Sequence, residues 1–113
     1  VYGDGKNVRD WLFVKDTASA IFKIFNSNIL NETFNITPDN EMENIEIISR
    51  ILKILDLDPD KSVEFIRDRL GHDFRYSICG EKLSTLYSEF SNFEDSLRET
   101  VDFYTREINE NNV

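Results

Sequence analysis

Short apolar stretches alternate with amphipathic segments along this sequence. Four stretches favour extended backbone, because they are rich in β-branched and aromatic residues: 1–14, 33–37, 63–66 and 76–78. Within the first, Gly3-Asp4-Gly5 is typical of a hairpin turn, since glycine accepts the positive φ that such turns need. Strands interleaved with helices indicate an α/β class, or α+β for an isolated piece. These strands are too few and too short for a complete doubly wound sheet.

Helical periodicity predicts about four helices, near residues 17–27, 40–55, 81–90 and from 92 onward. Asp16, Asn40 and Ser91 are the expected N-caps, because their side-chain oxygens can accept from the free N–H groups of a first turn. The side chains expected to point inward are Ala18, Ile21, Phe22 and Phe25, then Ile45, Ile48, Leu52 and Leu55, then Val63 and Phe65, and finally Leu97, Val101, Tyr104 and Ile108.

The composition limits the classes of protein to which the chain can belong. Its 113 residues, 40% of them hydrophobic, suit one domain or part of one. A formal net charge of −9 argues against a nucleic-acid partner. No apolar run is long enough to span a bilayer and no signal-peptide pattern is present, so we expect a soluble, cytoplasmic protein with no membrane partner. The chain begins at Val1, inside an expected strand, which suggests a piece of a longer protein.

Several patterns that resemble catalytic motifs fail on spacing. One cysteine and one histidine cannot supply four side-chain zinc ligands, so no metal site is expected. Gly3-x-Gly5 lacks the third glycine of a dinucleotide fingerprint and lies between two strands rather than before a helix. Tyr2-x-x-x-Lys6 has the spacing of a dehydrogenase pair, but the glycines between them will not hold the helix that the pair needs.

The segment RDRLGHDFRY, residues 67–76, gathers three arginines and the only histidine around one glycine. Gly71 permits a tight turn and leaves the backbone open to a ligand. Arg69 offers a planar fork of donors suited to phosphate, and His72 can donate a further bond. Taken alone, however, the segment favours surface ion pairs of its arginines with Asp68 and Asp73, which are common and contribute little.

Two further residues are candidates for anion binding. Arg9 lies in VRDWLFV, among residues expected in the core, and its alternative role is an ion pair with Asp10 or Asp16. Asn44 stands in the first turn of an expected helix, where free N–H groups bind anions, and its alternative is a simple exposed polar residue.

These pieces, in this order, resemble a known family. YGDGKNVRDWLFVKD, ETFNIT, NEMENIEI, VEFIRDRLGHDFRYSI and FEDSLRETVDFY are similar to the C-terminal third of the dTDP-glucose 4,6-dehydratases. Those enzymes are extended short-chain dehydrogenases/reductases. The resemblance covers nearly the whole chain. RDWLFV is shared loosely with epimerases and decarboxylases, whereas DR-x-GHD-x-RY is more specific to the dehydratases.

The resemblance implies a fold and a role. Residues 1–113 would be the C-terminal nucleotide-sugar-binding portion of an extended Rossmann-type enzyme, whose N-terminal Rossmann domain binds NAD and is absent from this chain. Arg9, Asn44, Arg69, His72 and Tyr76 would contact the diphosphate or nucleotide of a dTDP-sugar. No catalytic, cofactor-binding or metal-binding residue would lie here, so the chain alone would be inactive. The complete enzyme would be a homodimer.

The sequence also departs from the family pattern, and alternatives stay open. Leu70 stands where the family usually has proline, and LYSEFSN replaces the family's LGW-x-P stretch. The chain could instead be part of a related nucleotide-sugar epimerase or decarboxylase. A third possibility is a non-catalytic binding module derived from the family.

Overall fold

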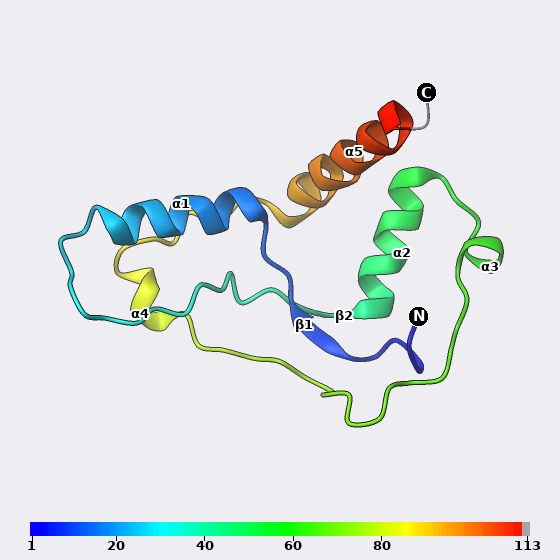
Figure 1. Ribbon diagram of the computed structural model, residues 1–113, viewed down its shortest axis with the longest axis horizontal. Coiled ribbons are helices and arrows are strands. Elements are labelled where there is room, and N and C mark those ends of the chain that lie inside the picture. The colour runs from blue at the N-terminus through cyan, green and yellow to red at the C-terminus, as the bar shows by residue number, and fades with distance from the viewer. Residues whose placement is uncertain (112–113) are drawn as a thin grey trace.

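The computed structural model describes residues 1–111 of the chain. Its elements, in chain order, are β1 (Val8–Asp10), α1 (Val14–Phe25), β2 (Glu41–Glu43), α2 (Asn44–Leu55), α3 (Pro59–Ser62), α4 (Glu81–Ser84) and α5 (Phe93–Asn111) (Figure 1). The mixture of helices and short strands confirms the predicted α/β class. Within the described residues, no helix is both long enough and apolar enough to cross a membrane.

The two short strands pair with each other across the chain. β1 and β2 are antiparallel, with Arg9 opposite Met42 at the centre of the register. The predicted hairpin at residues 1–14 is therefore wrong, although its turn exists: Gly3 and Gly5 have φ of 58° and 74°. Tyr2, before the turn, makes an isolated parallel bridge to Ile66 instead of pairing with β1. A turn signal is local, whereas the partner of a strand is chosen by contacts distant in sequence.

The other predicted strands do not join this sheet. Residues 33–37 are irregular, yet Phe34 and Ile36 are half-buried on one side and pack against the main hydrophobic cluster. Residues 63–66 and 76–78 are extended connections with isolated bridges beside them. A strand needs a hydrogen-bonded neighbour, and within residues 1–111 these segments lack a continuous one.

Three long helices form where the sequence predicts them, but they begin at other residues. α1 begins before Asp16, which is buried and caps nothing in its own helix. α2 begins at Asn44, because residues 41–43 pair as β2, so Asn40 is not its cap. The predicted helix at 81–90 is reduced to the single turn α4. At the start of α5 the side chain of Asn92, rather than Ser91, accepts from the N–H of Asp95 at 3.2 Å.

The core is small and lies off the predicted helix face. It gathers Ala20 of α1, Leu83 of α4 and Tyr87, and Leu83 is the largest side chain that is fully buried. Ile47, Leu52 and Val101 are buried in α2 and α5, which pack together. Several side chains that were predicted to point inward are exposed, namely Ala18, Ile21, Phe22 and Phe25 of α1, Leu55 of α2, Phe65, and Tyr104 and Ile108 of α5.

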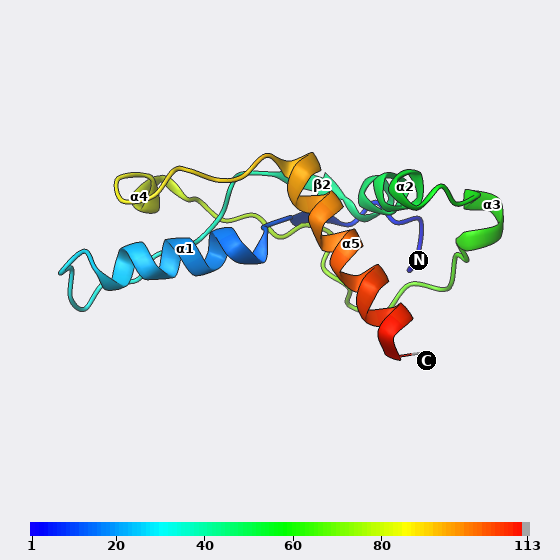
Figure 2. The ribbon, with the colours of Figure 1, turned by 90° about the horizontal axis from the view of Figure 1, so that it is seen from above.

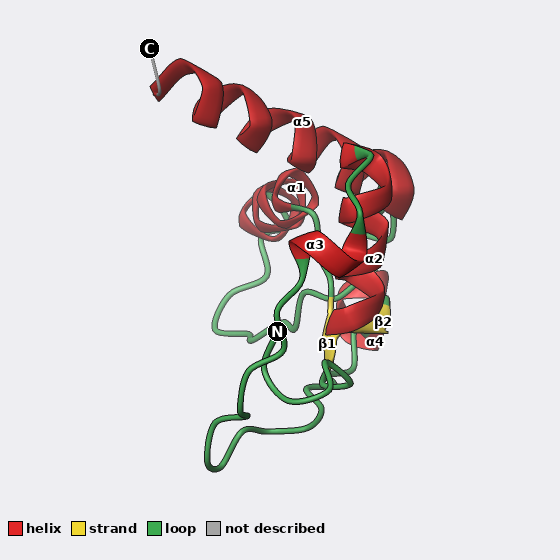
Figure 3. Cartoon of the chain, turned by 90° about the vertical axis from the view of Figure 1, so that its right-hand side faces the viewer, coloured by secondary structure: helices red, strands yellow, loops and turns green. Residues whose placement is uncertain are grey.

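The overall shape is flat and open. The described chain measures 51 × 38 × 22 Å, and its radius of gyration is 17.0 Å. A compact domain of this length would have a radius of about 13 Å. α1 and α5 extend away from the small sheet, and the two views turned by 90° show a shallow molecule (Figures 2 and 3). The exposed apolar side chains follow from this shape.

Candidate anion-binding site

Four of the five predicted site residues come from two segments that run side by side, and the fifth, Asn44, begins α2. Arg9 lies on β1, while Arg69, His72 and Tyr76 lie on the long connection between α3 and α4 (Figure 1). Backbone hydrogen bonds join the two segments: the N–H of Val8 donates to Phe74 at 2.8 Å and the N–H of Tyr76 donates to Val8 at 3.2 Å. The connection is thereby fixed beside β1.

A tight turn at Gly71 brings Arg69 and His72 together. Gly71 has φ of 70°, a conformation that other residues adopt rarely, and the N–H of His72 donates back to the carbonyl of Arg69 at 3.3 Å. No atom lies within 4 Å of the place where a Cβ of Gly71 would stand, so this side of the turn is open. Leu70, where the family has proline, points its side chain into solvent and is 93% exposed.

His72 is the centre of the cluster. Its Nε2 lies 2.7 Å from an Nη2 of Arg69 and 3.1 Å from Nη2 of Arg9. A guanidinium has only donors, so Nε2 accepts both bonds and carries no hydrogen. Nδ1 therefore holds the ring hydrogen and donates it to Asp68 at 2.8 Å. The side chain of His72 is 8% exposed, which makes it the buried member of the group.

The two arginines differ in how many donors the protein already uses. Nη1 of Arg9 donates to the carbonyls of Val8 (2.6 Å) and Phe74 (3.3 Å), and its Nη2 donates to the carbonyl of Asp73 (2.9 Å) as well as to His72. The guanidinium of Arg69 makes a single hydrogen bond, to His72. Arg69 is exposed and retains most of its donors for a ligand.

Each guanidinium also rests on a tyrosine ring. The Cζ of Arg9 lies 4.2 Å from the centre of the Tyr76 ring, and that of Arg69 lies 4.7 Å from the centre of the Tyr2 ring. The hydroxyl of Tyr76 donates to Asp73 at 2.7 Å, and this bond raises the pKa of the tyrosine. Sequence reasoning missed Tyr2, whose spacing to Lys6 was its only notable feature.

Asn44 is connected to the cluster only indirectly. Its backbone N–H donates to the carbonyl of Asn7 at 3.0 Å, and the side chain of Asn7 donates to the carbonyl of Asp73 at 3.3 Å. The Oδ1 of Asn44 is buried and has no hydrogen-bond partner. The structure thus brings together Arg9, Arg69, His72 and Tyr76. Asn44 is linked to them only through Asn7.

Acidic side chains border the cluster. The hydrogen bond from His72, aided by the N–H of Arg69, lowers the pKa of Asp68 below its usual value. Arg75 turns to β2 and donates to both oxygens of Glu41, at 2.7 and 3.0 Å. Arg75 therefore does not form the ion pair with Asp68 or Asp73 that was expected for the arginines of this segment.

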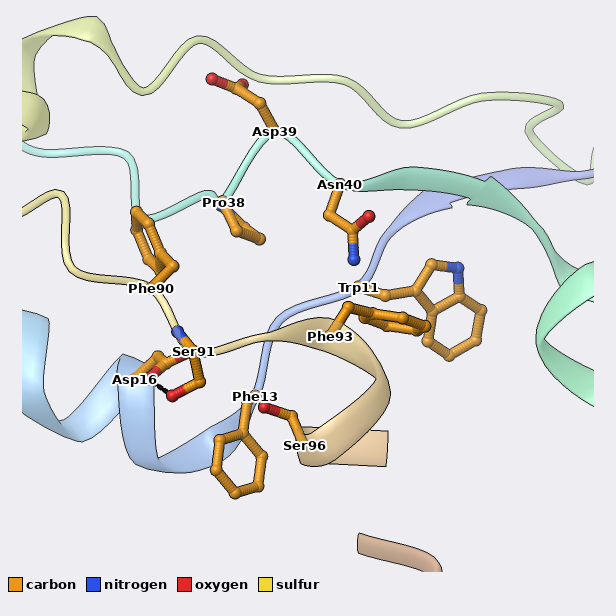
Figure 4. Close-up of a pocket in the computed structure, with 10 residues that line it drawn as sticks. All are labelled: Trp11, Phe13, Asp16, Pro38, Asp39, Asn40, Phe90, Ser91, Phe93 and Ser96. Atoms are coloured by element: carbon orange, nitrogen blue, oxygen red, sulfur yellow. Dashed lines mark hydrogen bonds between the residues drawn. The ribbon is translucent and has the colours of Figure 1, made fainter. Parts of the chain in front are cut away.

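A separate hollow lies beyond the sheet, between α1 and the start of α5. Its volume is about 190 Å³, and Trp11, Phe13 and Phe93 form part of its wall (Figure 4). The carboxylate of Asp16 accepts from the N–H and the hydroxyl of Ser91 at its edge, at 2.9 and 2.7 Å. None of the five predicted residues lines this hollow.

Comparison with known proteins relates the chain to nucleotide-sugar enzymes. Residues 1–37 match the NAD dependent epimerase/dehydratase family. Over 92% of its length the chain is 38% identical to a dTDP-glucose 4,6-dehydratase of Neisseria meningitidis and 40% identical to a probable one of Sinorhizobium fredii. It spans about a third of the length of these curated relatives, 33% and 32% respectively.

Solved structures agree with the sequence matches. The dTDP-glucose 4,6-dehydratase of Bacillus anthracis, in complex with NAD, is 39% identical with a TM-score of 0.83, over 94% of this chain and 34% of that one. The Streptomyces venezuelae enzyme, with NAD and TYD bound, is 34% identical with a TM-score of 0.84, over 93% and 33%. A UDP-N-acetylglucosamine 4-epimerase of Methanobrevibacter ruminantium reaches the same TM-score of 0.84 at 26% identity, over 95% and 34%.

Proposed function

We propose that this chain, whose residues 1–37 match the NAD dependent epimerase/dehydratase family, is the substrate-binding portion of a dTDP-glucose 4,6-dehydratase. Such an enzyme converts dTDP-glucose to its 4-keto-6-deoxy derivative with loss of water. In this proposal residues 1–113 hold the nucleotide diphosphate. An N-terminal Rossmann domain carries NAD and the catalytic groups, and the complete enzyme is a cytoplasmic homodimer.

One observation carries the proposal: two guanidinium groups converge on the same nitrogen of His72. Two neighbouring guanidinium groups concentrate positive charge at one place in a chain of net charge −9, and such a place attracts an anion. A diphosphate has charge and acceptor oxygens enough for both, and arginine donors match phosphate geometry. We assign the main anion contact to Arg69, which has unused donors, and the placement of the loop chiefly to Arg9.

The remaining predicted residues take supporting roles in the same proposal. Tyr76 stacks under Arg9 and lines the pocket. Asn44 offers a buried carbonyl oxygen without a partner, which suits a hydrogen bond from the nucleotide. His72, predicted to contact the diphosphate, acts here through the two arginines that it holds, because both of its ring nitrogens already have partners.

The surroundings of Gly5, in the glycine pattern that resembles a dinucleotide loop, do not fit NAD. In a dinucleotide loop, glycine leaves room for the pyrophosphate to approach the backbone. Here a Cβ added to Gly5 would meet Cβ of Ile45 and Cγ1 of Val1, both at 3.0 Å, so side chains already occupy that space. We therefore assign NAD binding to the N-terminal domain and none of it to this segment.

A related epimerase is the second candidate, since the epimerase from Methanobrevibacter ruminantium has a TM-score of 0.84. The identities of 39% and 34% to solved dehydratases, against 26% to that epimerase, favour the dehydratase. A non-catalytic binding module is the third.

Product analysis separates the three candidates. The enzyme that contains this chain is incubated with dTDP-glucose and NAD, and the sugar nucleotides are separated. A 4-keto-6-deoxy product is expected. If the product is instead the C4 epimer, the chain belongs to an epimerase. If the dTDP-glucose is unchanged, the result favours the non-catalytic binding module.

A further inference from the structure

Asp68 lies behind His72, outside the set of residues predicted to bind substrate. We infer that Asp68 is a positioning residue of the diphosphate site, which fixes the tautomer of His72 so that Nε2 can hold Arg9 and Arg69 together. This inference rests on the proposed function, because it concerns the same site. The contact on which it depends is the hydrogen bond of 2.8 Å between Nδ1 of His72 and Oδ1 of Asp68.

The tautomer decides whether the cluster attracts or repels its own arginines. With the hydrogen on Nδ1, the lone pair of Nε2 faces both guanidinium groups and accepts from each. With the hydrogen on Nε2, an N–H would point at two sets of N–H donors, and the Nδ1 lone pair would face a carboxylate. Asp68 can only accept while ionised, so it selects the first arrangement.

Asp68 is itself held in place by the turn at the start of the chain. The N–H of Arg69 donates to its Oδ1 at 2.8 Å. Its side chain packs against Gly3, where an added Cβ would lie 3.1 Å from Oδ2 and 3.2 Å from Cβ of Asp68. Gly3 has φ of 58°, and its N–H donates to the carbonyl of Ile66 at 2.9 Å. The carboxylate therefore has little freedom to leave Nδ1.

The groups that face His72 come from each neighbouring segment. β1 supplies Arg9, the connection between α3 and α4 supplies Arg69 and Asp68, and the N-terminal segment supplies the ring of Tyr2, edge-on at 6.4 Å between centroids. Asp68 is the only carboxylate among these contacts. It offsets the charge of the two guanidinium groups while leaving the outward donors of Arg69 for an anion.

By fixing His72, Asp68 preorganises the guanidinium groups of Arg9 and Arg69 for an anion. An anion that binds to guanidinium groups already held together need not overcome their repulsion or order their side chains. Carboxylates that orient the imidazole of a metal ligand are worth roughly 10- to 100-fold in affinity. By the same reasoning, loss of Asp68 should weaken diphosphate binding by about 10-fold.

The tautomer can be read directly, because His72 is the only histidine in the chain. Nitrogen NMR of the chain labelled with ¹⁵N-histidine distinguishes a protonated ring nitrogen from one with a lone pair. The expected result, without any ligand, is a hydrogen on Nδ1 and none on Nε2. A hydrogen on Nε2, or on both nitrogens at neutral pH, would overturn the inference whatever the binding data show.

Binding of inorganic diphosphate, measured by calorimetry, supplies the second readout. Asp68→Asn should give a mixture of tautomers and an affinity lower by about 10-fold, while Asp68→Glu should restore both toward the original. Asp60→Asn, which makes the same chemical change on α3, is the control. It should alter neither the tautomer of His72 nor the affinity for diphosphate. The side chain of Asp68 is 41% exposed, so its replacement should leave the thermal unfolding midpoint close to that of the original chain.

The outcomes separate the inference from the proposed function. If Asp68→Asn binds diphosphate as tightly as the original chain and keeps the tautomer, Asp68 positions nothing. If the original chain shows the expected tautomer but binds neither inorganic diphosphate nor dTDP, the proposed function fails while the positioning of His72 stands.

Discussion

The guanidinium carbon of Arg9 lies 4.2 Å from the centre of the Tyr76 ring, although the two residues are 67 positions apart. The same guanidinium donates to the carbonyls of Val8, Asp73 and Phe74. Arg9 therefore ties the connection between α3 and α4 to β1. Arg75, which donates to Glu41 of β2, is a second side-chain link between this connection and the sheet.

Arg9→Lys should destabilise the fold, because one ammonium cannot reach the three carbonyls and the histidine at once. Hydrogen bonds from a charged group contribute about 1.5–3 kcal/mol, so we expect a loss of about 2 kcal/mol in the free energy of unfolding. Urea denaturation measures it. Lys6→Ala, at a side chain 61% exposed, is the control and should change little. Equal stability of Arg9→Lys and the original chain would mean that these contacts contribute nothing.

In contrast to Arg9→Lys, Arg69→Ala should weaken ligand binding and leave the stability of the fold nearly unchanged. Its guanidinium makes one hydrogen bond within the protein, so the free energy of unfolding should change by less than about 1 kcal/mol. The dissociation constant for dTDP should rise by about 10- to 100-fold, from the loss of about 1.5–3 kcal/mol of charged hydrogen bonding. Calorimetric titration measures it, with Arg67→Ala as the matched control on the same segment. An unchanged dissociation constant would reduce Arg69 to a surface residue.

The pair formed by Arg75 and Glu41 should make stability depend on pH. The bonds donated by Arg75, and then by Ser77, hold the pKa of Glu41 below its ordinary value of 4.5. A carboxyl whose pKa is lowered by folding stabilises the fold above its unfolded pKa, and this contribution is lost as the pH falls through the folded pKa. Glu41→Gln should therefore flatten the decline in stability between about pH 6 and pH 3.

Thermal unfolding midpoints across that pH range test this expectation, with Glu64→Gln, at an exposed glutamate, as the control. Curves of Glu41→Gln and the original chain that run parallel would show that Glu41 titrates alike in the folded and unfolded states.

The sequence was sufficient for the features that depend on local pattern. α2 and α5 follow their apolar periodicity, and Gly3, Gly5 and Gly71 adopt the positive φ that their turns require. The segment of residues 67–76 also carries most of the candidate site, as its concentration of arginine and histidine indicated.

Features set by distant partners could not be read from the sequence. Asp16 has the spacing of an N-cap, but it accepts from Ser91, 75 residues away. Nη2 of Arg9 lies 3.1 Å from Nε2 of His72, although the two residues are 63 positions apart. Helix periodicity identified an apolar face on α1 around Phe22, yet periodicity cannot tell whether that face meets this chain or another body.

The contact of Asp16 with Ser91 should be a major link between α1 and the start of α5. Asp16 is 6% exposed, and its carboxylate accepts two hydrogen bonds from Ser91. Asp16→Ala should cost about 2–3 kcal/mol in the free energy of unfolding. A double-mutant cycle with Ser91→Ala should give a coupling on the order of 1 kcal/mol. Additive effects would indicate that the two residues act independently, and Asp102→Ala, at an exposed site on α5, is the control.

The apolar face of α1 should contribute little to the stability of this chain by itself. Phe22 is 67% and Phe25 84% exposed, whereas Ala20, on the same helix, is fully buried. Phe22→Glu should change the free energy of unfolding by less than about 0.5 kcal/mol, because its ring loses almost no contact. Ala20→Glu should unfold the chain, because it places a charge in the core.

If the N-terminal domain proposed above covers this face, Phe22→Glu should in addition destabilise the complete enzyme, since the charge would then be buried at an interface. Equal loss of stability from both substitutions in the isolated chain would show that the exposed face already packs against the rest of residues 1–111, and that no second body is needed to explain it.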